Sequence, residues 1–312
     1  MNFSWKFCEN YKNYNKQNKN STLSKGKLKI MNNQKFNRIW AAYFSPTGNT
    51  KKIVTQIATT LSKKLDATLC RHNFTLPKSR HQYPEFADDD LVIFGTPVYA
   101  GRVPNLFLPY IASIPGNSAF AVPVVTYGAR AFDDALIELR DTLESNKFRT
   151  IAGAALVGEH AFSRTLGAKR PNKFDMSEVD EFTENLYNKI ISKNILAENI
   201  ENHQAVKVDG EFPYRTHMRP KNAAGEFIKF LTIKPITDEK CTDCKICAKV
   251  CPTGAIPLDA VTTCTGKCIK CNACVKKCPE DAKHFVDVDY IFHKEELEEL
   301  YTYAPREPKF FL

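Results

Sequence analysis

A repeated cysteine pattern constrains this chain more than any other feature. Of its 11 cysteines, nine lie between 241 and 278, and eight of these nine form two copies of one pattern. In each copy, Cys-x2-Cys-x2-Cys-x3-Cys is followed directly by Pro. Structural zinc ordinarily takes separated Cys pairs that supply four ligands, whereas this region offers two triplets, each with a fourth cysteine. The pattern therefore disfavours zinc, and it disfavours disulfides even more strongly.

The spacing matches the run that holds cubane iron–sulfur clusters, and the region resembles bacterial ferredoxins. In that family, three thiolates of a tight loop bind one cluster and the fourth binds the other. The resemblance implies one 4Fe–4S cluster on Cys241, Cys244, Cys247 and Cys278, and a second on Cys268, Cys271, Cys274 and Cys251. Cys264 lies outside both quartets. We expect it to be a spare thiol, and the alternatives are a replacement ligand or a sensor.

The two remaining cysteines, Cys8 and Cys70, are isolated along the chain. This is a poor basis for a disulfide framework and fits a reducing compartment, so we expect a cytoplasmic protein. The longest nearly apolar stretch, 118–129, is interrupted by Pro123 and is far shorter than the roughly 18 residues of a membrane span. We therefore expect no membrane span.

The formal charge of +9 is concentrated at the amino terminus. Residues 1–38 hold nine Lys and Arg side chains against Glu9, so the remaining residues carry a net charge of only +1. We therefore expect no basic face on a folded domain and no nucleic-acid partner. Residues 1–37 are rich in Asn and Lys, which predicts a disordered basic tail. Met31 is an alternative start of the functional chain.

After this tail, an apolar run at 39–44 predicts a buried strand, and an amphipathic segment that ends at Leu65 predicts a helix. Between them lies the loop Ser45-Pro46-Thr47-Gly48-Asn49-Thr50. Its hydroxyl groups and the backbone N–H groups at the helix start would surround a phosphate, where the helix dipole also favours negative charge. A capped helix start without a ligand is the alternative interpretation.

Two more buried strands, at 91–95 and 119–126, lead into loops rich in aromatic and small residues. The carboxyl ends of parallel strands form the ligand crevice of an open α/β sheet, so the three loops would converge there. All three resemble the loops of flavodoxins, which bind FMN. The resemblance implies FMN contacts from Ser45, Thr47, Gly48, Asn49 and Thr50, then from Pro97, Val98 and Tyr99, and finally from Tyr127, Gly128 and Arg130. Tyr99 and Tyr127 could instead be rim residues that pack on protein.

A fifth strand is expected at 150–157 and a last helix at about 177–193. The flavodoxin strand order 2-1-3-4-5 would place the fifth strand at the sheet edge, away from the switch point. His160 follows this strand, so we favour a structural or docking role over flavin chemistry.

Together, these motifs resemble the flavodoxin–ferredoxin fusion proteins of anaerobic microbes. The expected fold is a flavodoxin-like doubly wound parallel sheet over 38–193, a connecting segment over 194–236, a small α+β bacterial ferredoxin-like domain over 237–290 and a carboxy-terminal extension over 291–312. The chain has no GxGxxG motif after a strand, so electrons are expected to come from another redox protein.

The resemblance implies a flavo-iron-sulfur oxidoreductase that passes electrons between two clusters and FMN, and so couples one- and two-electron steps. No catalytic acid, base or nucleophile is required. A second hypothesis is a flavin-site reductase of a small-molecule electron acceptor such as a quinone, fed through the ferredoxin module. A third is an iron–sulfur redox sensor.

Overall fold

The structure is a computed structural model that describes residues 35–197, 200–304 and 306–312. Most of the predicted tail, together with Cys8 and Met31, lies outside the described residues. Residues 35–37 are described, although the prediction placed them in the tail. Phe36 is buried with its ring edge against Phe120, at 5.4 Å between ring centroids. The folded part of the chain therefore includes Phe36.

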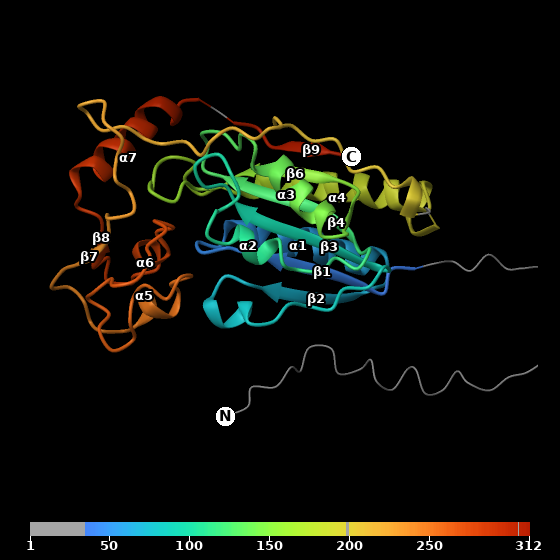
Figure 1. Cartoon of the computed structure of the whole chain (residues 1–312), viewed down its shortest axis with the longest axis horizontal. Helices are drawn as coiled ribbons and strands as arrows, with labels where there is room; N and C mark the ends of the chain where they lie inside the picture. Colours follow the sequence, from blue (N-terminus) through green and yellow to red (C-terminus); the bar gives the residue numbers. More distant parts are fainter. Residues whose placement is uncertain (1–34, 198–199, 305) are drawn as a thin grey trace, which may run out of the picture.

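A twisted parallel sheet forms the centre of the amino-terminal domain (Figure 1). Its strand order is β2-β1-β3-β4-β6. The strands are β1 (Arg38–Tyr43), β2 (Thr68–Asn73), β3 (Asp90–Pro97), β4 (Phe120–Tyr127) and β6 (Gly153–Val157), and the short β5 (Arg149–Thr150) pairs with the start of β4. This is the flavodoxin-like doubly wound order, and it confirms the predicted fold class.

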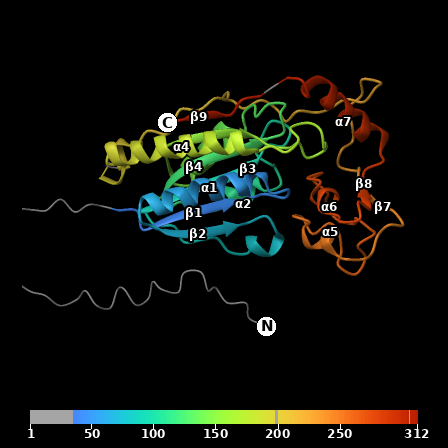
Figure 2. The ribbon, with the colours of Figure 1, turned by 180° about the vertical axis from the view of Figure 1, so that it is seen from behind.

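Helices cover both faces of this sheet (Figures 1 and 2). One face is covered by α1 (Asn49–Lys64) and α4 (Lys173–Ser192), and the other by α2 (Leu108–Ile111) and α3 (Ala135–Ser145). Helix α4 begins earlier than predicted because Asn172 caps its first turn and Asp175 completes a capping box. The central strands β3 and β4 are buried on both faces, as is usual for parallel sheets.

The last strand of the chain corrects the prediction for the sheet edge. Strand β9 (Lys309–Phe311) pairs antiparallel with β6, so the fifth strand of the doubly wound order is not at the edge. Phe310 of β9 stacks on Phe182 of α4, at 4.9 Å between ring centroids. The carboxy-terminal segment thus returns to the first domain and completes its core.

The small second domain lies beyond the carboxyl ends of the parallel strands (Figure 1). It contains the antiparallel pair β7 (Ile236–Thr237) and β8 (Lys283–His284) and the one-turn helices α5 (Ile246–Lys249) and α6 (Ala273–Lys276). Helix α7 (Val288–Tyr301) leads from this domain back toward β9, and short 3-10 turns form at Pro77–Arg80, Ile195–Ala197 and Ile200–Asn202. In the part of the chain that the structure describes, no helix is long and apolar enough to cross a membrane.

Candidate functional site

The loop at 45–50 connects the carboxyl end of β1 to the start of α1. Gly48 has a φ of 111°, a left-handed conformation that glycine adopts without a steric penalty, and the helix begins at the next residue. The Ser45 hydroxyl accepts a hydrogen bond from the Lys51 amide at 3.0 Å, and the Thr50 hydroxyl lies 2.6 Å from that of Thr126. These bonds fix the loop at a helix N-terminus, where an anion is stabilised.

A cavity of about 400 Å³ opens between this loop, the ends of β3, β4 and β6, and the second domain. We call it the large cavity. Of the eleven residues predicted to contact FMN, ten line it: Ser45, Thr47, Asn49, Thr50, Pro97, Val98, Tyr99, Tyr127, Gly128 and Arg130. Gly48 is not among the described residues that line it, and it acts through the loop conformation instead.

The two predicted tyrosines occupy different environments within this cavity. The Tyr127 hydroxyl donates to the carbonyl of Glu307 at 3.0 Å, so its polar end is held by the carboxy-terminal segment. Burial raises the pKa of both tyrosines. Tyr99 lies close enough to Cys268 and Cys271 for these thiols to raise its pKa further. Tyr99 therefore lines the large cavity together with the loops of the first domain and with Cys268 and Cys271 of the second cysteine motif.

His160 also lines the large cavity, in contrast to the reasoning that placed it away from the switch point. Its Nδ1 accepts the Phe162 amide hydrogen at 3.1 Å, which leaves the ring proton on Nε2. Burial lowers the pKa of His160 to about 3, so the ring is neutral at pH 7. The ring packs so closely on Gly128 that a Cβ there would lie 2.3 Å from His160 Cδ2. Only a glycine fits at that position without movement.

The connecting segment contributes residues that were not among the predicted FMN contacts. Arg215 forms an ion pair with the buried Asp134, and the Met218 amide donates to the Ala100 carbonyl at 2.9 Å. These bonds hold His217 at the wall of the large cavity, where its Nε2 is buried without a hydrogen-bond partner among the described residues. The basic, Pro-bounded stretch around His217 was the available signal. An unpaired buried nitrogen beside an open cavity suits a ligand with polar edges.

The eight motif cysteines line two smaller cavities in the second domain. One is lined by Cys241, Cys244, Cys247 and Cys278, and the other by Cys251, Cys268, Cys271 and Cys274 together with Cys264. The structure thus brings the fourth cysteine of each motif to the triplet of the other. This is the crossed grouping that the resemblance to ferredoxins implies.

The backbone around both thiol cavities is suited to anionic sulfur. The amides of Ala255 and Ala282 donate to the Sγ atoms of Cys251 and Cys278 at 3.2 and 3.3 Å. Burial raises the pKa of Cys271, and it raises that of Cys274 to about 12, so binding a cluster must displace protons from these thiols. The two amide donors and the four thiols around each cavity fit an iron–sulfur cluster.

Cys264 lines the same cavity as the Cys268 quartet. Burial raises the pKa of Cys264 to about 11, so its thiol is protonated at pH 7. Its role as a spare thiol stays a prediction.

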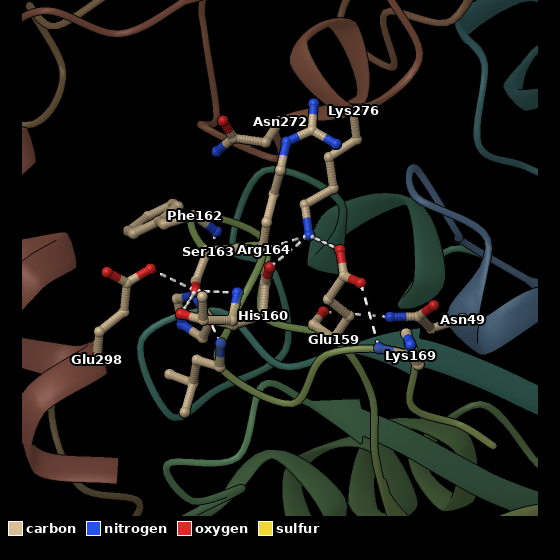
Figure 3. A network of polar contacts seen from close by, with 12 residues as sticks. Asn49, Glu159, His160, Phe162, Ser163, Arg164, Lys169, Asn272, Lys276 and Glu298 are labelled. Carbon is tan, nitrogen blue, oxygen red and sulfur yellow. Dashed lines mark hydrogen bonds and ion pairs between the residues drawn. The ribbon is translucent and has the colours of Figure 1, made fainter. Parts of the chain in front are cut away.

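A polar network connects α6 to the first domain (Figure 3). Lys276 Nζ pairs with the Glu159 carboxylate and also donates to the carbonyls of His160 and Ser163, at 2.6 and 2.9 Å. Further contacts between the domains are the ion pair of Arg164 with Asp281 and a hydrogen bond from Arg80 to the carbonyl of Pro252. These contacts fix the second cysteine motif beside the large cavity.

Comparison with known proteins gives the class of the second domain. Residues 234–256 and 265–284 match the sequence family described as 4Fe-4S binding domain. A search of curated proteins finds no match to this chain. Among solved structures, a flavodoxin of Streptococcus pneumoniae TIGR4 is 18% identical, with a TM-score of 0.34 over 49% of this chain and 99% of its own.

Two other similar structures cover the same half of the chain. A Fusobacterium nucleatum flavodoxin variant bound to flavin mononucleotide is 16% identical, with a TM-score of 0.31 over 51% of this chain and 95% of its own. A short-chain flavodoxin associated with a non-canonical PDU bacterial microcompartment is 13% identical, with a TM-score of 0.33 over 49% of this chain and 97% of its own.

The chain therefore joins a flavodoxin-like α/β domain, defined by its strand order, to a 4Fe-4S binding domain. This confirms the predicted resemblance to flavodoxin–ferredoxin fusion proteins. The combination supports a role in electron transfer.

Proposed function

We propose that this protein is an oxidoreductase that passes electrons between two 4Fe–4S clusters and FMN, and so couples one- and two-electron steps. The observation that carries the proposal is a shared wall. Cys268 and Cys271 of the second cysteine motif line the same cavity as the loop at 45–50. When bound, a cluster exchanges one electron at a time and the flavin exchanges one or two.

The residues of the large cavity have distinct roles in this proposal. Ser45, Thr47, Asn49 and Thr50 bind the phosphate group at the start of α1, with Gly48 shaping the loop. The isoalloxazine ring is enclosed by the loops after β3 and β4, which provide Pro97, Val98, Tyr99, Tyr127, Gly128 and Arg130. His160 and His217 are additional polar groups at the wall.

The two cysteine quartets are the proposed cluster ligands. Cys241, Cys244, Cys247 and Cys278 hold one cluster, and Cys268, Cys271, Cys274 and Cys251 hold the other. The external donor or acceptor is a redox protein, and the cytoplasm is the expected compartment.

Cofactor content under anaerobic conditions tests this proposal. We expect about eight irons, about eight sulfides and one released FMN per chain. The double variant Ser45→Ala/Thr50→Val tests the phosphate loop, and it should lose FMN while keeping its iron. Iron without FMN in the unmodified protein would mean that the first domain is only a scaffold. About four irons per chain would contradict the presence of a second cluster.

Kinetic measurements then test whether electrons pass between the clusters and FMN within one molecule, in whichever direction they flow in the cell. Reduction of the clusters should be followed by bleaching of flavin absorbance within the same molecule, at a rate that does not depend on protein concentration. A rate proportional to protein concentration would instead mean transfer between molecules.

The mouth of the large cavity favours a second candidate, a flavin-site reductase of a small apolar acceptor. Leu231, with 89% of its surface exposed, and Leu106, with 40% exposed, both line this cavity. Exposed apolar side chains at a pocket mouth are suited to an apolar ligand. Turnover of a water-soluble quinone by the reduced holoprotein would support this candidate, and loss of that turnover in Leu231→Asp would locate it at the mouth.

A further inference from the structure

The two cysteine motifs have equal spacing but different surroundings. Cys268, Ile269, Lys270 and Cys271 line the large cavity. Among the described residues that line this cavity, none comes from the first triplet and Cys278 is absent too. We call Cys251, Cys268, Cys271 and Cys274 the inner quartet, and Cys241, Cys244, Cys247 and Cys278 the outer quartet.

Equivalent positions of the two motifs differ in exposure. Lys270 and Asn272 of the inner motif are buried. Their counterparts in the outer motif, Asp243 and Lys245, expose 68% and 44% of their side chains. Cys244 is exposed, whereas its counterpart Cys271 is buried. The outer quartet therefore reaches the surface of the protein through Cys244, whereas the inner quartet borders the large cavity through Cys268 and the buried Cys271.

The two quartets are also close to each other. Cys247 of the outer quartet and Cys274 of the inner quartet belong to one apolar cluster with Ile256 and Val261. Electrons can therefore pass from the surface to the large cavity through two neighbouring centres.

We propose that the outer quartet is the port at which an external redox protein exchanges electrons, and that the inner quartet is the one that exchanges electrons with the flavin. This inference rests on the proposed function. A reduced partner gives one electron to the outer centre and is itself oxidised by one electron. With the clusters and FMN bound, that electron would pass to the centre on the inner quartet, and two such transfers, together with protons from water, would reduce the flavin. The reverse order serves an oxidised partner.

The charge around Cys244 indicates the chemistry of the partner. Near the outer quartet, the acidic side chains of Glu239, Asp243 and Glu280 are matched in number by Lys240, Lys245 and Lys249, and the buried Lys283 at the same cavity adds one positive charge. The oxidised cluster with its four thiolates adds a charge of about 2−. The port is therefore negative overall, and it suits a one-electron redox protein with a basic face.

Charge reversal at Asp243 tests the port, with ferric cytochrome c as a basic one-electron acceptor. The substitution Asp243→Lys suits the backbone, because Asp243 has a φ of 53° and the equivalent Lys270 has the same value. In electrochemically reduced holoprotein at low ionic strength, we expect cytochrome c reduction to slow by at least about threefold. In this variant, the rate of cytochrome c reduction should also fall less steeply with added salt than in the unmodified protein.

Two matched variants locate the effect. Glu181→Lys makes the same charge reversal on the exposed face of α4 and should leave the rate unchanged. Lys229→Glu adds negative charge next to the segment that lines the mouth of the large cavity, and it should also leave the rate unchanged. Equal slowing by Glu181→Lys would overturn the port. A faster rate in Lys229→Glu without an effect of Asp243→Lys would move docking to the flavin mouth.

Removal of the outer cluster gives an independent measurement. In Cys244→Ala, iron should fall by about half while FMN is retained, and cytochrome c reduction should slow at least tenfold. If this variant loses all its iron, the three charge variants alone decide whether the outer quartet is the port. Failure of the proposed function is distinguishable, because the clusters would then fail to reduce the flavin in the unmodified protein. Failure of the port alone would leave that step intact.

Discussion

Lys276 Nζ contacts the Glu159 carboxylate across the boundary between the two domains, while the Glu159 carbonyl accepts a hydrogen bond from Asn49 Nδ2 at 3.2 Å (Figure 3). Glu159 thus joins the first residue of α1, where a phosphate would bind, to the last residue of α6, which follows Cys274 by two positions. The relationship links the two candidate cofactor sites through one side chain and one carbonyl.

Replacing Lys276 with Met should loosen the contact between the domains. The variant leaves the Glu159 carboxylate without its cation and two carbonyls without their donor, a loss of about 2–4 kcal/mol. We expect flavin reduction by the clusters to slow at least tenfold at unchanged iron and FMN content. Rapid-mixing absorbance measures this rate, and urea unfolding measures the stability.

Lys249→Met is the control for this prediction, because Lys249 occupies the equivalent position of the first motif and is exposed. It should change neither the rate nor the unfolding midpoint. Equal effects of the two substitutions would show that Lys276 does not position the domains.

Adding a methyl group at Gly128 should perturb the large cavity. The new Cβ would lie 2.3 Å from His160 Cδ2 and 2.8 Å from His160 Cα, so the loop after β6 must move. We expect Gly128→Ala to weaken FMN binding at least tenfold, as measured by fluorescence titration of the apoprotein. His160→Ala in the same chain removes the ring and should restore part of the affinity. Additive losses in the double variant would contradict the steric explanation.

Lys283 provides a buried positive charge to the cluster region. Its side chain is fully buried, and Nζ donates to the Val261 carbonyl at 2.6 Å. The charge lies near Cys247 and Cys274, one from each quartet, and lowers the pKa of both thiols against the larger effect of burial. Because reduction makes a cluster more negative, Lys283→Met should lower the cluster midpoint potentials by roughly tens of millivolts.

Potentiometric titration with electron paramagnetic resonance detection measures this shift. Lys240→Met removes an exposed lysine near the same region and should leave both potentials within about 10 mV of their original values, since solvent screens exposed charges. Unchanged potentials in Lys283→Met would mean that the buried ammonium is compensated elsewhere.

The stability of the first domain should depend on pH through His72. Burial lowers the pKa of His72 from 6.5 to about 4, and its Nε2 lies 2.8 Å from the Tyr110 hydroxyl. Between these two values the unfolded chain binds the proton and the folded chain does not, so stability falls as the pH decreases from about 6.5 to 4. One such group contributes a slope of at most about 1.4 kcal/mol per pH unit.

Urea unfolding at several pH values checks this slope. His72→Gln should reduce the slope by the contribution of one group, with that of His160 remaining, whereas substitution of the exposed His81 by Gln should leave the slope unchanged. An unchanged or steeper slope in His72→Gln would contradict the assignment.

Local patterns in the sequence were sufficient to predict the central strands of the first domain. The apolar runs at 39–44, 91–95 and 119–126 are β1, β3 and β4 within one or two residues at most of their ends, because a strand buried on both faces must be continuously apolar. The fifth strand, predicted over 150–157, is interrupted between Thr150 and Gly153 and forms β5 and β6. Because the sequence is apolar throughout this run, it does not predict where the strand pairing is interrupted.

The sequence by itself determined the chemistry of the candidate sites, because cysteine spacing and a hydroxyl-rich loop before a helix depend on residues close together in the chain. Tertiary structure alone decided how these sites face each other. It placed β9 beside β6, His160 and His217 at one cavity wall, and the second cysteine motif, rather than the first, beside that cavity. The two motifs have the same spacing, so no local signal distinguishes them. Their difference comes from long-range contacts such as Lys276 with Glu159, which only the packed chain contains.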